Sequence, residues 1–251
     1  MRPLKLLLYG QPGVGKTTVA ATCVFVPEYR PVLCLSFENS ITPIYDICND
    51  VTDWRNATID PEKVNIINFG DWKEMVSLWE KTEGKAFVKQ FKTVIIDSMS
   101  NANIKLLSYI KGNSSSDPNV QTKDITFKHW GRMFDILNEL VWSLQEAEGL
   151  SYILICHEKA VEDEVAKFPM FQGNQLGPII CGAVDHVGYM SGDNSGGRVL
   201  SFQNTLKAFA KRRKGSKFDI HTGTLSVDEN PVILKGIITV PQICKELNLA
   251  Q

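Results

Sequence analysis

The chain has 251 residues and a mass of 28.1 kDa, and hydrophobic residues make up 43% of it and charged residues 22%. These values are typical of soluble globular domains, and they exclude a disordered chain, a coiled coil and a collagen-like fibre. The 27 Lys and Arg residues nearly balance the 28 Asp and Glu residues, giving a net charge of −1. That balance excludes a protein that coats nucleic acid by charge alone.

The apolar runs and the cysteines indicate a cytoplasmic protein. The longest runs, such as residues 6–9 and 152–156, are too short to span a bilayer. The first predicted strand begins within a few residues of Met1, so we expect no signal peptide. The six cysteines form no C-x-x-C pair, which favours reduced core thiols over a zinc site.

Strand and helix patterns alternate along the N-terminal half at the spacing of βαβ units. We predict strands over residues 4–9, 31–37 and 64–69, and helices over residues 16–26 and 41–49. Asp71 and Glu74 resemble a capping box, which predicts a helix from there to about residue 82. A short β-branched strand over residues 93–96 then ends in Asp97.

The next segments combine a polar stretch with a long amphipathic pattern. Residues 112–123 are polar and are predicted to form a mobile loop. Apolar residues recur at helical spacing over 127–148, predicting a long helix that Gly149 ends. A core strand follows over residues 151–156.

Beyond this strand, short alternating segments over residues 184–190, 198–202 and 206–211 predict hairpins added antiparallel at the sheet edge. The fold class is therefore α/β, a mostly parallel sheet flanked by helices with antiparallel strands in the C-terminal part. We expect one domain over residues 1–251, with a nucleotide-binding core in 1–160 and a region of loops and edge hairpins in 161–251.

Residues 10–17 read Gly-Gln-Pro-Gly-Val-Gly-Lys-Thr and fit the phosphate-loop pattern G-x-x-x-x-G-K-[ST] between a predicted strand and helix. The glycines let successive backbone N–H groups point at phosphate oxygens. The helix N-terminus adds a partial positive charge. The predicted nucleotide-binding residues are Gly10, Gln11, Pro12, Gly13, Val14, Gly15, Lys16, Thr17 and Thr18.

This pattern predicts ATP with Mg²⁺ as the ligands. Lys16 is expected to reach the β- and γ-phosphates, and the Thr17 hydroxyl to bind Mg²⁺. Asp97 ends an apolar strand, as the Walker B carboxylate of such sites does, and is the second expected Mg²⁺ ligand. An Asp at a strand end is also a common helix cap, so this role depends on the phosphate loop.

Residues 34–45 (CLSFENSITPIY) resemble the stretch of RecA recombinases in which a strand ends in the catalytic glutamate. The order of parts is similar over about residues 4–215, and it gives the fold class a RecA-like P-loop NTPase core. By this resemblance Glu38 activates the attacking water, and His157, which follows the strand over 151–156, senses the γ-phosphate. The alternatives are a helix cap for Glu38 and a purely structural histidine.

Lys211 and Arg213 lie in a stretch that resembles the K-x-R-x-G fingers of DnaB-type helicases and RadA proteins. Such fingers reach the nucleotide of a neighbouring subunit, where arginine stabilises transition-state charge. The alternatives are a solvated basic turn and a contact with nucleic-acid phosphates.

The DNA-binding loops of the resembled family follow the sensor strand, which corresponds here to about residues 158–182. Aromatic and amide side chains between glycines suit base stacking and backbone contacts, and they suit a surface hairpin equally well. The candidate DNA-binding residues are Lys167, Phe168, Phe171, Gln172, Asn174 and Gln175.

The whole chain resembles the minimal RecA-core ATPases of bacteriophages, a group associated with single-strand annealing and recombination. The resemblance implies a DNA-stimulated ATPase that acts on single-stranded DNA, assembles with itself in a ring or filament, and has a single-strand DNA-binding protein as a further candidate partner. Two other functions remain open: an ATP-switched loader or regulatory module, and a small-molecule kinase.

Overall fold

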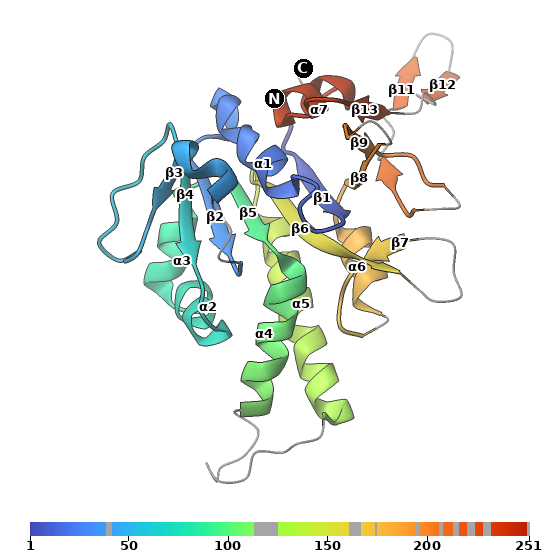
Figure 1. The fold of residues 1–251 in the computed structure, drawn as a ribbon. Coiled ribbons are helices and arrows are strands. Elements are labelled where there is room, and N and C mark those ends of the chain that lie inside the picture. Colours follow the sequence, from blue (N-terminus) through green and yellow to red (C-terminus); the bar gives the residue numbers. More distant parts are fainter. Residues whose placement is uncertain are drawn as a thin grey trace.

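The computed structural model of the chain describes residues 1–38, 42–112, 125–160, 167–173, 175–193, 196–205, 208–212, 216–219, 224–227 and 232–249. Its centre is an eleven-stranded sheet in the order β13-β9-β8-β1-β6-β5-β2-β4-β3, with β10 against β8 and β7 against β6 (Figure 1). The sheet is mostly parallel and carries helices on both faces, and its antiparallel strands belong to the C-terminal part. The predicted α/β class is thereby confirmed.

Seven strands run parallel, and their carboxyl ends therefore meet at one edge of the sheet. They are β1 (Lys5–Gly10), β2 (Val32–Ser36), β3 (Cys48–Asp50), β4 (Val64–Asn68), β5 (Thr93–Asp97), β6 (Ser151–Ala160) and β8 (His186–Gly192). Antiparallel neighbours are β7 (Lys167–Pro169), β9 (Arg198–Ser201), β10 (Lys211–Arg212) and β13 (Ile233–Lys235), and a separate hairpin pairs β11 (Ser216–Asp219) with β12 (Thr224–Val227).

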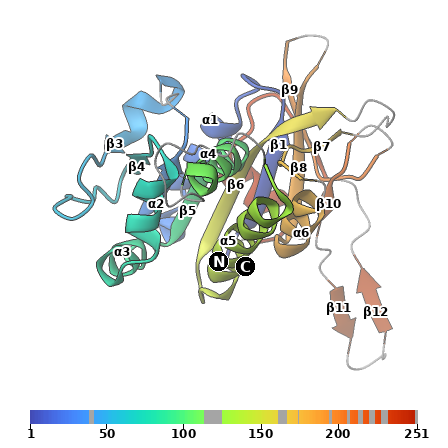
Figure 2. The ribbon, with the colours of Figure 1, turned by 90° about the horizontal axis from the view of Figure 1, so that it is seen from below.

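Alternate residues of the strands pack into two hydrophobic cores, one on each face of the sheet. One core lies under α1 (Lys16–Ala21), the three-ten helix η1 (Thr22–Phe25) and α7 (Val240–Glu246). The other lies under α2 (Trp72–Trp79), α3 (Thr82–Val88), α4 (Met99–Gly112), α5 (Phe127–Glu146) and α6 (Leu176–Ala183), as seen from below in Figure 2. In the part of the chain that is described, none of the helices is long and apolar enough to cross a membrane.

Two predicted helices are shorter than expected. The helix over 16–26 ends at Ala21 and continues as η1, because the Thr22 hydroxyl donates to the Val19 carbonyl and accepts from the Val240 N–H. The helix over 41–49 is instead the three-ten helix η3 (Thr42–Ile47) followed by β3, since Ile44 is its one buried side chain and provides no apolar face.

The helix that Asp71 begins also stops early, at Trp79. Asp71 does cap it by accepting from the Glu74 N–H, but α3 then starts a new direction at Thr82. Gly84 of α3 makes this close turn possible, because a Cβ there would lie 1.9 Å from the Leu78 carbonyl oxygen. The helix α4 was not among the predicted elements. The helix predicted over 127–148 is confirmed as α5.

In the C-terminal part, β9 pairs antiparallel as predicted, but β8 runs parallel to β1 and extends the central sheet. The strand predicted over 206–211 is reduced to β10, with Ala208 in an isolated bridge to Lys167. Residues 113–124, most of the predicted loop, lie outside the described residues. A third short three-ten helix, η2 (Pro27–Tyr29), precedes β2.

Candidate nucleotide-binding site

The phosphate loop joins the end of β1 to the start of α1 at the carboxyl edge of the sheet. Gly13 and Gly15 have positive φ angles of 77° and 95°, a conformation that side chains disfavour. Gly10 has a different constraint, because a Cβ there would lie 2.0 Å from the Met190 carbonyl oxygen of β8. The glycines of the motif therefore fix both the curl of the loop and its packing against the neighbouring strand.

The Lys16 side chain folds back over this loop. Its ammonium donates to the carbonyl oxygens of Gly10 at 3.0 Å and Gln11 at 2.7 Å. Burial lowers the pKa of Lys16, while the Asp97 and Glu38 carboxylates oppose this shift. The Lys16 ammonium therefore lies between two groups. One is the loop backbone, which would surround phosphate groups, and the other is the pair of carboxylates of Asp97 and Glu38.

Thr17 and Asp97, the two predicted Mg²⁺ ligands, are in contact. The Thr17 hydroxyl donates to Asp97 Oδ2 at 2.6 Å, across the strand β6 that separates β1 from β5. Burial raises the pKa of Asp97 to about 6. A hydroxyl and a carboxylate are hard oxygen ligands of the kind that Mg²⁺ prefers, so this pair fits the predicted ion together with phosphate oxygens.

Glu38 lies just beyond β2 and is held by side chains from two other elements. Its Oε1 accepts from His157 Nε2 of β6 at 3.0 Å and from Asn101 Nδ2 of α4 at 3.1 Å. The hydrogen bond from His157 is the main cause that lowers the pKa of Glu38, with Ser98 contributing as well. Glu38 is therefore held as a carboxylate at the same edge as Lys16 and Asp97.

The sequence profile of the AAA domain family matches residues 2–214, which span the phosphate loop and all the site residues described so far. The chain belongs to this AAA domain family. No curated protein matched the sequence. Membership of a P-loop family supports ATP binding and hydrolysis by this AAA domain, with Mg²⁺ as the typical ion.

Two residues of the AAA domain site were not predicted from sequence. Asn101 lies in the first turn of α4, and its place beside Glu38 depends on a long-range contact. Arg198 begins β9, and a Cβ on Gly15 would lie 2.8 Å from its guanidinium carbon, so this cation rests against the phosphate loop.

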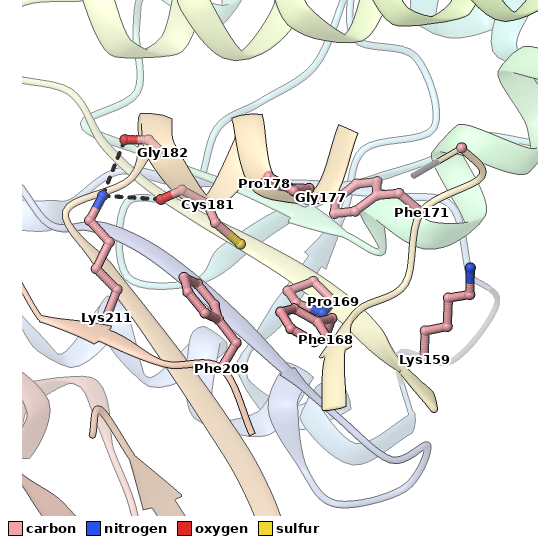
Figure 3. Close-up of a pocket in the computed structure, with 11 residues that line it drawn as sticks. Lys159, Phe168, Pro169, Phe171, Gly177, Pro178, Cys181, Gly182, Phe209 and Lys211 are labelled. Atoms are coloured by element: carbon pink, nitrogen blue, oxygen red, sulfur yellow. Dashed lines mark hydrogen bonds between the residues drawn. The ribbon is translucent and has the colours of Figure 1, made fainter. Parts of the chain in front are cut away.

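The Lys211 side chain contacts the backbone of its own chain. Its ammonium donates to the carbonyl oxygens of Cys181, Gly182 and Val184 at 2.8–3.2 Å and so caps the C-terminal end of α6. Figure 3 shows the contacts with Cys181 and Gly182. This contact gives Lys211 a structural role in the described part of the chain, and its role as a finger stays a prediction. Arg213, the other proposed finger, lies outside the described residues.

The candidate DNA-binding segment is only partly suited to its predicted role. Phe171 is 5% exposed and packs in the hydrophobic core, so the prediction that it stacks on bases is wrong. Phe168 is half-buried and stacks on Phe209 with ring centroids 5.8 Å apart. Lys167 pairs with Glu158 at 2.8 Å.

The remaining members of that segment lie on either side of a turn before α6. Gln172 and Gln175 are exposed, and the Gln172 N–H donates to Asn103 Oδ1 of α4. Asn174 lies outside the described residues. The hydroxyl of Ser100 on α4 also donates to the Met170 carbonyl, so α4 fixes the backbone of this turn.

A cavity of about 570 Å³ lies beside this segment, between β7, α6 and the residues before β10. Figure 3 shows Phe168, Pro169 and Phe209 along its wall, with Lys159 and Lys211 toward opposite ends. Lys159 and His157 are two residues apart on β6. One strand therefore connects the nucleotide site to this cavity.

Proposed function

We propose that this AAA domain hydrolyses ATP and couples that reaction to single-stranded DNA, in recombination, annealing or replication. The observation that carries the ATPase part is the convergence of Lys16, Thr17, Asp97 and Glu38 at one edge of the sheet. This combination provides a cation for phosphates, a Mg²⁺ site and a carboxylate base, which are the parts that phosphoryl transfer to water needs.

In the proposed reaction Glu38 accepts a proton from a water molecule while the water oxygen attacks the γ-phosphorus. The bond from that phosphorus to the bridging oxygen breaks, and ADP and inorganic phosphate leave. Bound Mg²⁺ neutralises phosphate charge. Lys16 and the loop N–H groups orient the triphosphate, and His157 and Asn101 fix the orientation of the Glu38 carboxylate.

The DNA part of the proposal rests on the connection through β6. His157 contacts the catalytic carboxylate, and Lys159 lines the cavity two residues later. The cavity provides an aromatic wall and the Lys159 ammonium, which suit a base and its phosphate. A change in the Glu38–His157 hydrogen bond on ATP binding would thus reach a surface of suitable chemistry. Phe168, Lys159 and the exposed amides replace Phe171 as the proposed contacts.

A second candidate function is an ATP-switched loader or regulatory module with low turnover. It is favoured by the engagement of Glu38 with both His157 and Asn101, since a carboxylate held by two donors is a weaker base. Assembly of the AAA domain with itself, in a ring or filament, remains a proposal for either function. Under the first function, Arg213 remains a proposed finger.

The test is the rate of ATP hydrolysis with and without single-stranded DNA, using Lys16→Ala as the inactive control. Loss of a charge-assisted contact with phosphates costs about 3 kcal/mol, so Lys16→Ala should weaken ATP binding roughly a hundredfold. Stimulation of the wild type by DNA supports the first function. ATP binding with negligible turnover under both conditions supports the second, and unchanged ATP affinity of Lys16→Ala contradicts both.

A further inference from the structure

We propose that Arg198 binds the phosphate chain of the nucleotide from within the same subunit. The inference rests on the proposed ATP-binding function and assigns a further positioning cation to that site. Its basis is the contact at Gly15, where an added Cβ would lie 2.8 Å from the guanidinium carbon and 3.0 and 3.1 Å from two of its nitrogens.

The backbone of Arg198 is fixed independently of this contact. Arg198 pairs with Gly192 of β8, and its carbonyl accepts from the Gly236 N–H at 2.9 Å. The strand β8 in turn pairs with β1, where Met190 lies opposite Gly10. The sheet register therefore positions Arg198 beside the loop, and the parallel direction of β8 is what brings this strand end to the nucleotide edge.

The guanidinium is available for a ligand. Arg198 is exposed, and none of the ion pairs formed within the described ranges involves its side chain. Lys16, in contrast, already donates to two loop carbonyls. An arginine held at the rim of a phosphate loop presents a planar set of N–H donors that matches phosphate oxygens.

The charges of the site favour such a contact. Asp97 and Glu38 place two carboxylates near the reacting end, whereas Lys16 is the cation that the motif itself provides. A triphosphate brings further negative charge. Arg198 supplies a second cation beside the loop from within the same subunit.

The experiment measures equilibrium binding of ATP, ADP and inorganic tripolyphosphate to the wild type, Arg198→Ala, Arg198→Lys and Lys16→Ala. The matched control is Arg132→Ala, which removes an exposed arginine from α5. We expect Arg198→Ala to weaken all three ligands about tenfold, Arg198→Lys to lose less because it keeps the charge, and Arg132→Ala to match the wild type. Thermal stability without ligand should be unchanged.

Three outcomes overturn the inference in distinguishable ways. If the wild type binds ATP and Lys16→Ala does not, but Arg198→Ala matches the wild type, only the role of Arg198 is wrong. If Arg198→Ala weakens ATP and leaves tripolyphosphate affinity unchanged, Arg198 contacts the base or ribose, and the phosphate assignment is wrong. If the wild type binds neither ATP nor tripolyphosphate, the proposed function is wrong and this inference fails with it.

Discussion

The nucleotide edge and the region from Lys167 to Arg212 differ in how side chains are used. At the edge, polar side chains contact one another between neighbouring elements: Thr17 with Asp97, and Glu38 with His157 and Asn101. The apolar residues of the same strands pack in the two hydrophobic cores. In the second region, residues that look functional in the sequence hold the fold together: Phe171 packs in the core and Lys211 caps α6. Substitution of Glu38 in the first region should therefore change chemistry, and substitution of Phe171 or Lys211 in the second should change stability.

The largest expected effect is that of Glu38→Gln on turnover. Replacing the carboxylate removes the proposed base and should slow ATP hydrolysis by roughly 10²- to 10⁴-fold, with ATP affinity and thermal stability close to wild type. Steady-state hydrolysis with a parallel binding titration checks this. The control is Glu246→Gln, an exposed glutamate at the end of α7. Retained turnover would mean that Glu38 is a structural carboxylate.

Phe171→Ala should instead destabilise the protein. Truncating a buried phenylalanine removes apolar contacts and leaves a cavity, at a cost of about 3 kcal/mol or more. Phe168→Ala, at a half-buried position, should lower the free energy of unfolding by less and weaken binding of single-stranded DNA. Urea denaturation and DNA titration of both variants separate the two roles. A stable Phe171→Ala protein that loses DNA binding would contradict the structure.

The nucleotide-site residues could be predicted from the sequence, whereas the roles of Phe171 and Lys211 could not. The phosphate loop, Asp97 and Glu38 lie at the ends of apolar strands, and His157 follows the apolar part of β6. Parallel strands bring these positions together, so local patterns were sufficient to group them. Phe171 and Lys211 also lie in plausible local patterns. Phe171, however, packs near Gly177 of α6, and Lys211 contacts the end of the same helix, and no spacing in the sequence reveals those contacts.

The direction of β8 and the position of Arg198 were missed for the same reason. An alternating segment bounded by turn residues predicts a strand but not its direction, and here β8 is parallel because it is reached through α6. Arg198 has no motif around it, and its place at Gly15 follows only from the sheet register.

Asp97→Asn should change how stability depends on pH at the nucleotide edge. Burial raises the pKa of Asp97 to about 6, from an ordinary value of about 4, so the native state binds this proton more tightly than the unfolded state. Wild-type stability should therefore fall as pH rises from about 4 to 6 and stay lower above that range. The Asp97→Asn protein has no carboxylate at this position, so its stability should not fall over this pH range.

The gain of Asp97→Asn over wild type should accordingly grow by up to about 3 kcal/mol between pH 4 and pH 7 in chelator. Denaturation at several pH values measures it. Added Mg²⁺ should reduce the gain, because the ion favours the carboxylate. A stability difference that is independent of pH would show that the pKa of Asp97 is the same in the folded and the unfolded protein.

The smallest expected effect is that of Lys211→Ala. Losing the ammonium leaves carbonyls at the end of α6 without their donor and should cost about 1 kcal/mol of stability. Lys211→Arg keeps the positive charge and should retain most of the stability that Lys211→Ala loses. ATP hydrolysis should change little in either variant. A severe loss of hydrolysis at unchanged stability would restore the finger role that the sequence suggested.

Under the proposed function, the Glu38 edge hydrolyses ATP and is connected through β6 to a surface that binds single-stranded DNA. Single-turnover ATP hydrolysis by wild type and by Phe168→Ala, each with and without single-stranded DNA, tests this proposal most directly. We expect DNA to accelerate hydrolysis in the wild type, and Phe168→Ala to keep the basal rate but lose most of the acceleration. Equal rates with and without DNA in the wild type would contradict it.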